Sequence, residues 1–143
     1  MRILIAEDSE DDTLLIIREL TRGGYKPEFH RVDEADAMRD ALDQGDWDLV
    51  ITDHNLPGFS SEQAIVMVKD SGHDIPVIIV SGSIGEEIAV AAMKMGAHDY
   101  IMKNNMTRLV PAIERELREA ENRRDSRRAQ DTIHHMAYHD ALT

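Results

Sequence analysis

Five polar side chains follow short apolar runs of the sequence, and their types suit the transfer of a phosphoryl group. They are the carboxylates of Glu7, Asp8 and Asp53, the hydroxyl of Ser81 and the amine of Lys103. Carboxylates gathered in one crevice repel one another, and Mg²⁺ relieves that repulsion by taking their oxygens as ligands. A lysine and a hydroxyl beside them can bind phosphoryl oxygens, while an aspartate acts as the nucleophile. These residue types predict a magnesium-dependent phosphoryl-transfer site.

The apolar runs before these side chains are rich in β-branched residues, which predicts strands. The predicted strands are residues 3–5, 29–32, 49–51, 77–80 and 100–102. Apolar residues at helical spacing occur between them, within residues 14–20, 35–42, 64–68 and 88–95, and a further helical segment follows. The alternation predicts an α/β fold, a doubly wound five-stranded parallel sheet with helices on both faces. Ligands bind at the carboxyl ends of such strands, so the five side chains are expected to meet in one crevice.

The charge of the chain is concentrated in its first part. Residues 1–103 contain 9 Lys/Arg against 21 Asp/Glu, whereas residues 104–143 contain 7 of each. An acidic domain repels phosphates, so we expect no nucleic-acid partner. The sequence has no Cys and no apolar run long enough for a signal peptide or a membrane span, which favours a cytoplasmic protein without a membrane segment.

The C-terminal part predicts one long helix. Its apolar stripe consists of Leu109, Ile113, Leu117 and Ala120. The polar stretch that follows, with the turns before it, contains charge pairs at helical spacing, namely Glu114 with Arg118, Glu119 with Arg123 and Arg127 with Asp131. We expect the stripe to extend beyond what its own sheet covers, so that this helix pairs weakly with the same helix of a second copy.

Four motifs, in order and spacing, resemble the receiver domain of two-component response regulators over residues 1–122. They are ILIAEDS, VITDHNLPG, VIIVSGS and GAHDYIMK. The resemblance implies a flavodoxin-like fold in which Asp53 is the phospho-acceptor and Asp8 binds Mg²⁺. It also implies that Glu7 acts through a metal-bound water and that Asn55 contributes its backbone carbonyl to the metal.

The same resemblance implies a switch more than an enzyme, with self-phosphorylation and autodephosphorylation as its only reactions. Ser81 and Lys103 would bind phosphoryl oxygens, and Tyr100 would change its orientation with the phosphorylation state. The phosphoryl donor would be a sensor histidine kinase, a phosphotransfer protein or a small phospho-donor. The signal would pass through the last strand and helix to an output domain.

Two departures from the family pattern concern loops near the site. Asn104 follows Lys103 where receivers commonly have Pro, often after a cis bond, so we expect a trans or locally different loop. Phe59-Ser60-Ser61 replaces the usual small acidic or glycine-containing turn, and we expect Ser60 or Ser61 to cap the next helix.

Ordinary structural roles remain open for several of these residues. Acidic residues after strands also serve as helix caps or turn residues, and Tyr100 can be a packing aromatic. His54 is expected in a solvent-facing loop at the mouth of the site. His135 and His139 have metal-ligand spacing but lack an evident third ligand, which favours a plain surface helix.

Other functions compete with a receiver switch. An aspartate-nucleophile phosphatase usually has an acidic residue two positions after its nucleophile, where this chain has Asn55. A degenerate receiver, acting as a phosphorylation-independent interaction module, would not need the complete set of site residues. The segment MAYHDALT, residues 136–143, resembles the opening of the GGDEF domain of diguanylate cyclases. That resemblance makes residues 123–143 a helical linker toward an output domain in cyclic di-GMP metabolism.

Overall fold

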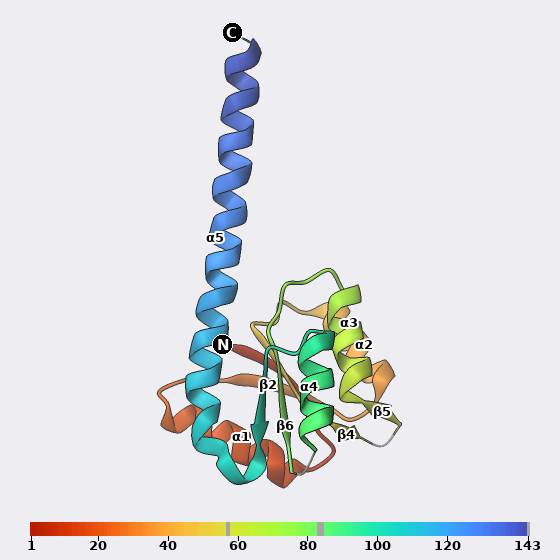
Figure 1. Ribbon diagram of the computed structural model, residues 1–143. Coiled ribbons are helices and arrows are strands. Elements are labelled where there is room, and N and C mark those ends of the chain that lie inside the picture. Colours follow the sequence, from red (N-terminus) through yellow and green to blue (C-terminus); the bar gives the residue numbers. More distant parts are fainter. Residues whose placement is uncertain (57, 83–84, 143) are drawn as a thin grey trace.

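The five predicted strands form one parallel sheet in the computed structural model, which describes residues 1–56, 58–82 and 85–142, without the side chains of residues 55, 86 and 127–142. The strands are β1 (Arg2–Ala6), β2 (Glu28–Val32), β3 (Leu49–Thr52), β6 (Val77–Ser81) and β7 (Asp99–Met102). Their order in the sheet is β2-β1-β3-β6-β7. Figure 1 shows the sheet among the helices. The predicted doubly wound fold is confirmed.

Helices alternate with these strands along the chain. They are α1 (Glu10–Arg22), α2 (Ala35–Gln44), α3 (Ser61–Asp70), α4 (Glu86–Met95) and α5 (Leu109–Leu142), with the 3₁₀ turn η1 (Lys103–Arg108) before α5. A small antiparallel pair, β4 (Asn55–Leu56) with β5 (Phe59–Ser60), was not predicted. Strands of two residues are too short to produce a recognisable pattern in the sequence.

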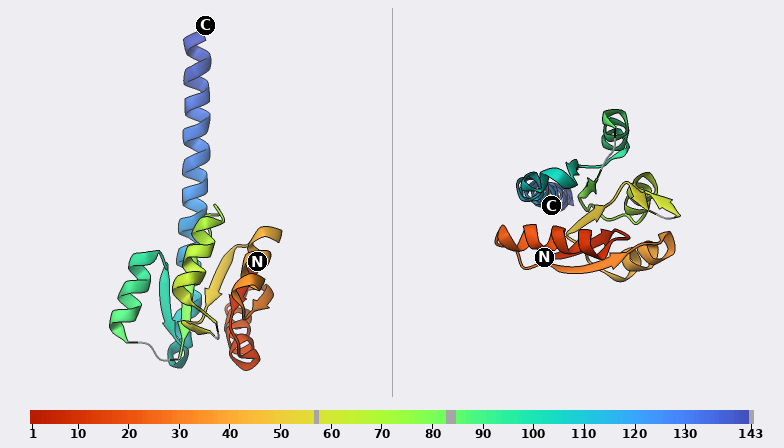
Figure 2. Two further views of the ribbon diagram at one scale, coloured as in Figure 1. Left: turned by 90° about the vertical axis from the view of Figure 1, so that its right-hand side faces the viewer. Right: turned by 90° about the horizontal axis from the view of Figure 1, so that it is seen from below.

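Two hydrophobic cores lie on opposite faces of the sheet, since successive residues of a strand point to opposite sides. Ile3 and Ile5 of β1 pack with α1 and α5, whereas Leu4 and Ala6 pack with α2, α3 and α4. Figure 2 shows the helices on both sides of the sheet. Each fully buried Leu or Ile side chain contributes about 1.5 to 3 kcal/mol, which is what keeps the strand ends in register around the site.

The expectation that every strand is covered on both faces is wrong for β2. Glu28, Phe29 and His30 are exposed, and Phe29 retains 44% of its accessible surface. This strand lies at the edge of the sheet, beyond the inner strands on which the two cores are centred. The inner strands β1, β3 and β6 are buried almost throughout, as predicted.

The apolar stripe of α5 is covered by the domain itself. Leu109, Ile113 and Ala120 are fully buried, and Leu117 is partly buried against the core shared with α1. The expectation that this stripe leaves apolar surface for another chain is therefore wrong. After the stripe, α5 continues away from the domain to Leu142 (Figure 1). None of the helices in the described part of the chain is apolar enough over a sufficient length to cross a membrane.

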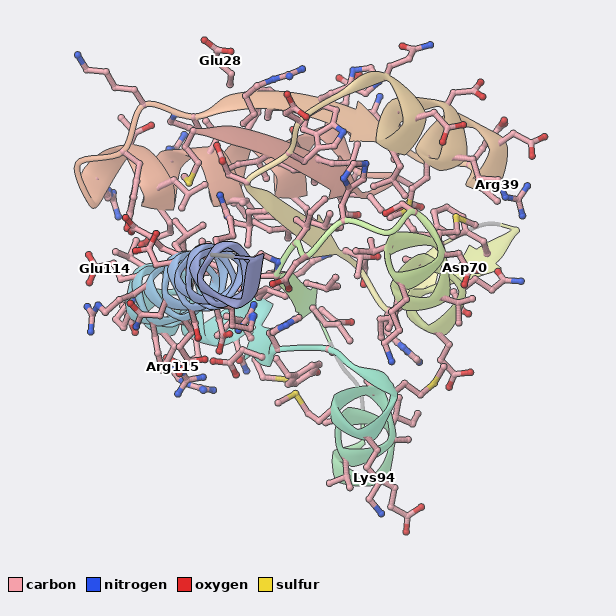
Figure 3. All side chains as sticks on the ribbon, turned by 90° about the horizontal axis from the view of Figure 1, so that it is seen from above. Glu28, Arg39, Asp70, Lys94, Glu114 and Arg115 are labelled. Atoms are coloured by element: carbon pink, nitrogen blue, oxygen red, sulfur yellow. The ribbon has the colours of Figure 1, made fainter. Side chains whose placement is uncertain are left out.

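Two arginines among the described side chains of α5 pair with residues of other elements, and Arg115 also contacts its neighbour Glu116. Arg123 donates to both oxygens of Asp74, in the loop before β6, at 3.0 and 3.2 Å. Arg115 donates to Asp99 of β7 at 3.1 Å. Figure 3 shows Glu114 on the outer side of α5, away from the sheet.

The predicted i, i+4 pairs of α5 have two different outcomes. Among the residues whose side chains are described, neither Glu114 with Arg118 nor Glu119 with Arg123 forms an ion pair. Arg123 contacts Asp74 instead of Glu119. Arg127 with Asp131, and the pair His135 with His139, lie outside the residues whose side chains are described. The side chains of residues 136–143, which carry the resemblance to a GGDEF domain, also lie outside the described residues.

His98 makes the stability of the domain depend on pH at the amino edge of the sheet. Its Nδ1 accepts a hydrogen bond from the Val77 N–H at 3.0 Å, and burial lowers the pKa of the imidazole below its usual value of 6.5. The imidazole of the unfolded chain therefore binds a proton more readily, so the contribution of His98 to the free energy of unfolding is expected to fall as the pH drops below about 6.5. Urea unfolding at pH 7.5 and 5.5 measures this.

The variant His98→Asn keeps an acceptor for Val77 but cannot become charged in this pH range. We expect it to lose less stability between the two pH values than the unmodified chain. The matched control is His73→Asn, since His73 is exposed. Equal pH dependence in the chain with His98 and in His98→Asn would contradict the assignment.

Candidate phosphoryl-transfer site

The carboxyl ends of four adjacent strands place the predicted side chains at one edge of the sheet. Ala6 pairs with Thr52, which puts Glu7 and Asp53 next to each other just beyond the strands. The Asp53 N–H donates to the Ala6 carbonyl at 2.9 Å and so continues the ladder of the sheet. On the other side of β3, Ser81 pairs with Met102 and ends β6 beside Lys103.

Lys103 holds this crevice together. Its Nζ lies 2.7 Å from Asp12 Oδ2, 3.0 Å from Glu7 Oε2 and 3.1 Å from Asp53 Oδ2. Burial disfavours the charged amine, but its contacts with the carboxylates of Asp12, Glu7 and Asp53 outweigh this effect and raise the pKa of Lys103 above its usual value. The amine is therefore a permanent cation in contact with the proposed acceptor.

Glu7 is buried at the bottom of the crevice. Burial raises the pKa of this carboxyl to about 7; the negative charge of Asp53 adds to the rise, while Lys103 and the Ser9 N–H oppose it. Oε1 accepts the Ser9 N–H at 3.1 Å. Oε2 forms an ion pair with Lys103 Nζ at 3.0 Å, but among the described residues it has no partner with hydrogen-bond geometry. This buried oxygen can therefore accept a further donor.

The acidic residues fit a hard divalent cation. One carboxylate oxygen from each of Glu7, Asp8 and Asp53 lies within 4.8 Å of the others. Such a set of oxygens suits Mg²⁺, and a metal-bound water would satisfy Glu7 Oε2. Asn55 lies two residues after Asp53 in β4, and the role predicted for its carbonyl stays a prediction.

Ser81 and Tyr100 lie on the neighbouring strands β6 and β7. Ser81 is buried, with 3% of its surface accessible. Tyr100 is half-buried, packs against the core shared by α2, α3 and α4, and donates its hydroxyl to Met102 Sδ at 3.0 Å. This position is compatible both with ordinary packing and with the predicted change of orientation, so the switch role stays a prediction.

The loop after Lys103 has a trans peptide bond before Asn104, since the described residues contain no cis peptide. The turn η1 follows, and Asn105 departs from helical geometry within it, with φ −137° and ψ 52°. The expected trans bond is confirmed.

The loop after Asp53 is fixed by a helix cap. Ser60 caps α3 in a reciprocal pair with Gln63, which confirms one of the two predicted caps. Ser61 is buried instead, and its hydroxyl is hydrogen-bonded to His54 Nδ1 at 2.7 Å. His54 is therefore not the free solvent-facing residue expected from the sequence, because its ring joins the acceptor loop to α3.

Asp12 is a site residue that the sequence analysis missed. The spacing Ser9-x-x-Asp12 is typical of a capping box, in which each side chain accepts a backbone N–H of the other residue. Ser9 Oγ does accept the Asp12 N–H, but the Ser9 N–H goes to Glu7, and the Asp12 carboxylate goes to Lys103. The capping signal was visible in the sequence, while the alternative partner lies 91 residues away.

An all-parallel sheet of this order, with an acidic crevice containing a lysine at its carboxyl edge, defines the class of flavodoxin-like signalling domains. The chain belongs to the response regulator receiver domain family, whose model matches residues 3–114. It is therefore a receiver domain of the two-component type. Receiver domains generally act as switches without separate enzymatic activity; response regulators have sensor histidine kinases as partners and carry output domains.

Individual relatives agree with this assignment. The response regulator protein FleR of Pseudomonas aeruginosa is 32% identical over 108 residues, which cover 71% of this chain but 21% of FleR. The chain spans about half or less of the other curated relatives that it matches. The crystal structure of NtrX from Brucella abortus is 27% identical in sequence and has a TM-score of 0.78. The match covers 90% of this chain and 29% of NtrX.

A third similar structure is the N-terminal domain of a response regulator/sensory box/GGDEF 3-domain protein from Carboxydothermus hydrogenoformans. It is 23% identical, has a TM-score of 0.71, and covers 86% of this chain and 98% of that one. At this identity the likeness shows the fold alone.

Proposed function

We propose that this receiver domain is a phospho-accepting switch in which Asp53 takes the phosphoryl group in a Mg²⁺-dependent reaction. The observation that carries the proposal is the contact of Lys103 Nζ with Asp53 Oδ2, at 3.1 Å, beside the three carboxylates that fit a divalent cation. The same crevice then contains a nucleophile, a fixed cation and a metal site, which are the parts needed for phosphoryl transfer.

The reaction uses the residues of the crevice in separate roles. An Asp53 oxygen attacks the phosphorus of a phosphohistidine or a small acyl phosphate, and the bond from phosphorus to the donor breaks. Lys103 and Ser81 donate hydrogen bonds to the transferred phosphoryl oxygens. Glu7, Asp8, Asp53 and the carbonyl of Asn55 would hold Mg²⁺, which supplies positive charge against the charge of the phosphoryl group.

The signal then leaves the site through β7 and α5. The phosphoryl group draws Ser81 toward it, Tyr100 turns toward the core, and the surface of α4, β7 and α5 changes as a shift between two populated states. Arg115 links α5 to Asp99 of β7, and Arg123 links it to Asp74 in the loop before β6. A change in the position of β7 is therefore transmitted to α5.

We place the domain boundary near residue 122, with residues 123–143 as a helical linker to an output domain. The support for a GGDEF output is the resemblance of residues 136–143 and the occurrence of a GGDEF domain in the protein whose N-terminal domain has a similar fold. Pairing of two copies through the C-terminal helix also stays a proposal, which sedimentation with and without beryllofluoride tests.

The function is tested by incubating the chain with acetyl phosphate and Mg²⁺ and measuring its mass. We expect one added phosphoryl group, mapped to Asp53 by peptide analysis, and loss of the modification with a chelator or in Asp8→Ala. A chain that stays unmodified, and does not bind beryllofluoride in the presence of Mg²⁺, would instead support a phosphorylation-independent interaction module.

A further inference from the structure

The amine of Lys103 has as many carboxylate partners as it has N–H groups. An ammonium has three donors, and Nζ lies within 3.1 Å of three different carboxylates. A phosphoryl group on Asp53 takes over the contact that the Asp53 carboxylate makes with this amine, so it shares the amine with Glu7 and Asp12. Each of these two carboxylates competes with the phosphoryl oxygens for the positive charge of the amine as long as it keeps its contact.

Asp12 is the partner that can leave at least cost. Its side chain is 31% exposed, against 2% for Glu7, so the released carboxylate can be hydrated without opening the core. Its contact with Lys103 is the shortest of the three, at 2.7 Å, so before phosphorylation Asp12 is the carboxylate that holds the amine most closely. The backbone of Asp12 stays in place whatever its side chain does, because its N–H is held by the helix-capping hydroxyl of Ser9.

We propose that Asp12 is a positioning residue that holds Lys103 in the unphosphorylated state and competes with the phosphoryl group for its amine. The inference rests on the proposed function of the site and adds a regulation to it. The Asp12 carboxylate stabilises the empty crevice by neutralising Lys103, and it repels an incoming anionic phosphoryl group. Asp12 thereby sets how tightly the site holds a phosphoryl group, although it lies outside the three carboxylates that fit the metal.

The test measures binding of beryllofluoride, a phosphoryl mimic, at saturating Mg²⁺. Asp12→Asn keeps the size of the side chain but removes the charge that competes for Lys103. We expect the dissociation constant of Asp12→Asn for beryllofluoride to be about three- to tenfold lower than that of the unmodified chain. The effect is moderate because the Asp12 carboxylate is partly exposed. Asp12→Glu restores a carboxylate and is expected to return the affinity toward that of the unmodified chain. Circular dichroism checks that each variant is folded.

The matched control is Asp11→Asn, which removes the same charge one residue earlier in the first turn of α1. Asp11 is exposed, and no contact of its carboxylate with Lys103 is present among the described residues. Equal affinities of the two Asn variants, or weaker binding by Asp12→Asn, would overturn the proposal. Because both variants are compared with the unmodified chain, absence of any binding by that chain would instead refute the proposed function.

Discussion

Replacing Asp53 with Asn is expected to slow phosphorylation by acetyl phosphate in the presence of Mg²⁺ by at least about a thousandfold. The amide nitrogen and oxygen of Asn have nearly the same positions as the two carboxylate oxygens, but neither is a nucleophile for phosphorus. The substitution also removes the partly buried charge that faces Lys103 and contributes to the raised pKa of Glu7. Mass spectrometry of the intact chain over time measures the rate.

The variant should remain folded, because losing one of several mutually repelling carboxylates costs little stability. Asp40→Asn is the control for charge: Asp40 is exposed on α2, and its replacement is expected to leave the rate unchanged. Modification of Asp53→Asn at the rate of the Asp40→Asn control would exclude Asp53 as the acceptor.

Replacing Lys103 with Met is expected to have the largest effect on stability. Met preserves most of the apolar stem but removes the cation that contacts Glu7, Asp12 and Asp53. Leaving buried carboxylates without their partner costs about 3 to 5 kcal/mol in fully buried cases, and we expect about 2 to 3 kcal/mol here because Asp12 is partly exposed. Urea unfolding in a metal-free buffer measures the loss.

Added Mg²⁺ should restore more stability to Lys103→Met than to the unmodified chain, because the cation then supplies the missing positive charge. Phosphorylation should still be strongly reduced, since no other group in the crevice replaces the amine at the phosphoryl oxygens. The control is Lys94→Met on α4, whose side chain extends away from the domain into solvent (Figure 3). If both Lys variants unfolded at the same urea concentration, Lys103 would not hold the crevice together.

The local sequence determined the elements and most of the site. Runs of β-branched residues and helical spacing are properties of neighbouring residues, so β1, β3, β6 and β7 appear where the sequence predicts them. Parallel strands share one carboxyl edge, and for that reason Glu7, Asp53 and Lys103 could be expected together before any contact was known. The cap at Ser60 is equally local, because it depends on residues three positions apart.

The tertiary structure decided the contacts between residues far apart in the chain. Asp12 belongs to the site only because packing of α1 against η1 and α5 brings it to Lys103, 91 residues later. Arg123 could pair with Glu119 on its own helix, yet the fold presents Asp74 with better two-oxygen geometry. The apolar stripe of α5 predicted a helix face but not what covers it, since burial depends on how far the neighbouring elements extend along that helix. Periodicity specifies which side of an element is apolar, whereas only the packed domain specifies the partner.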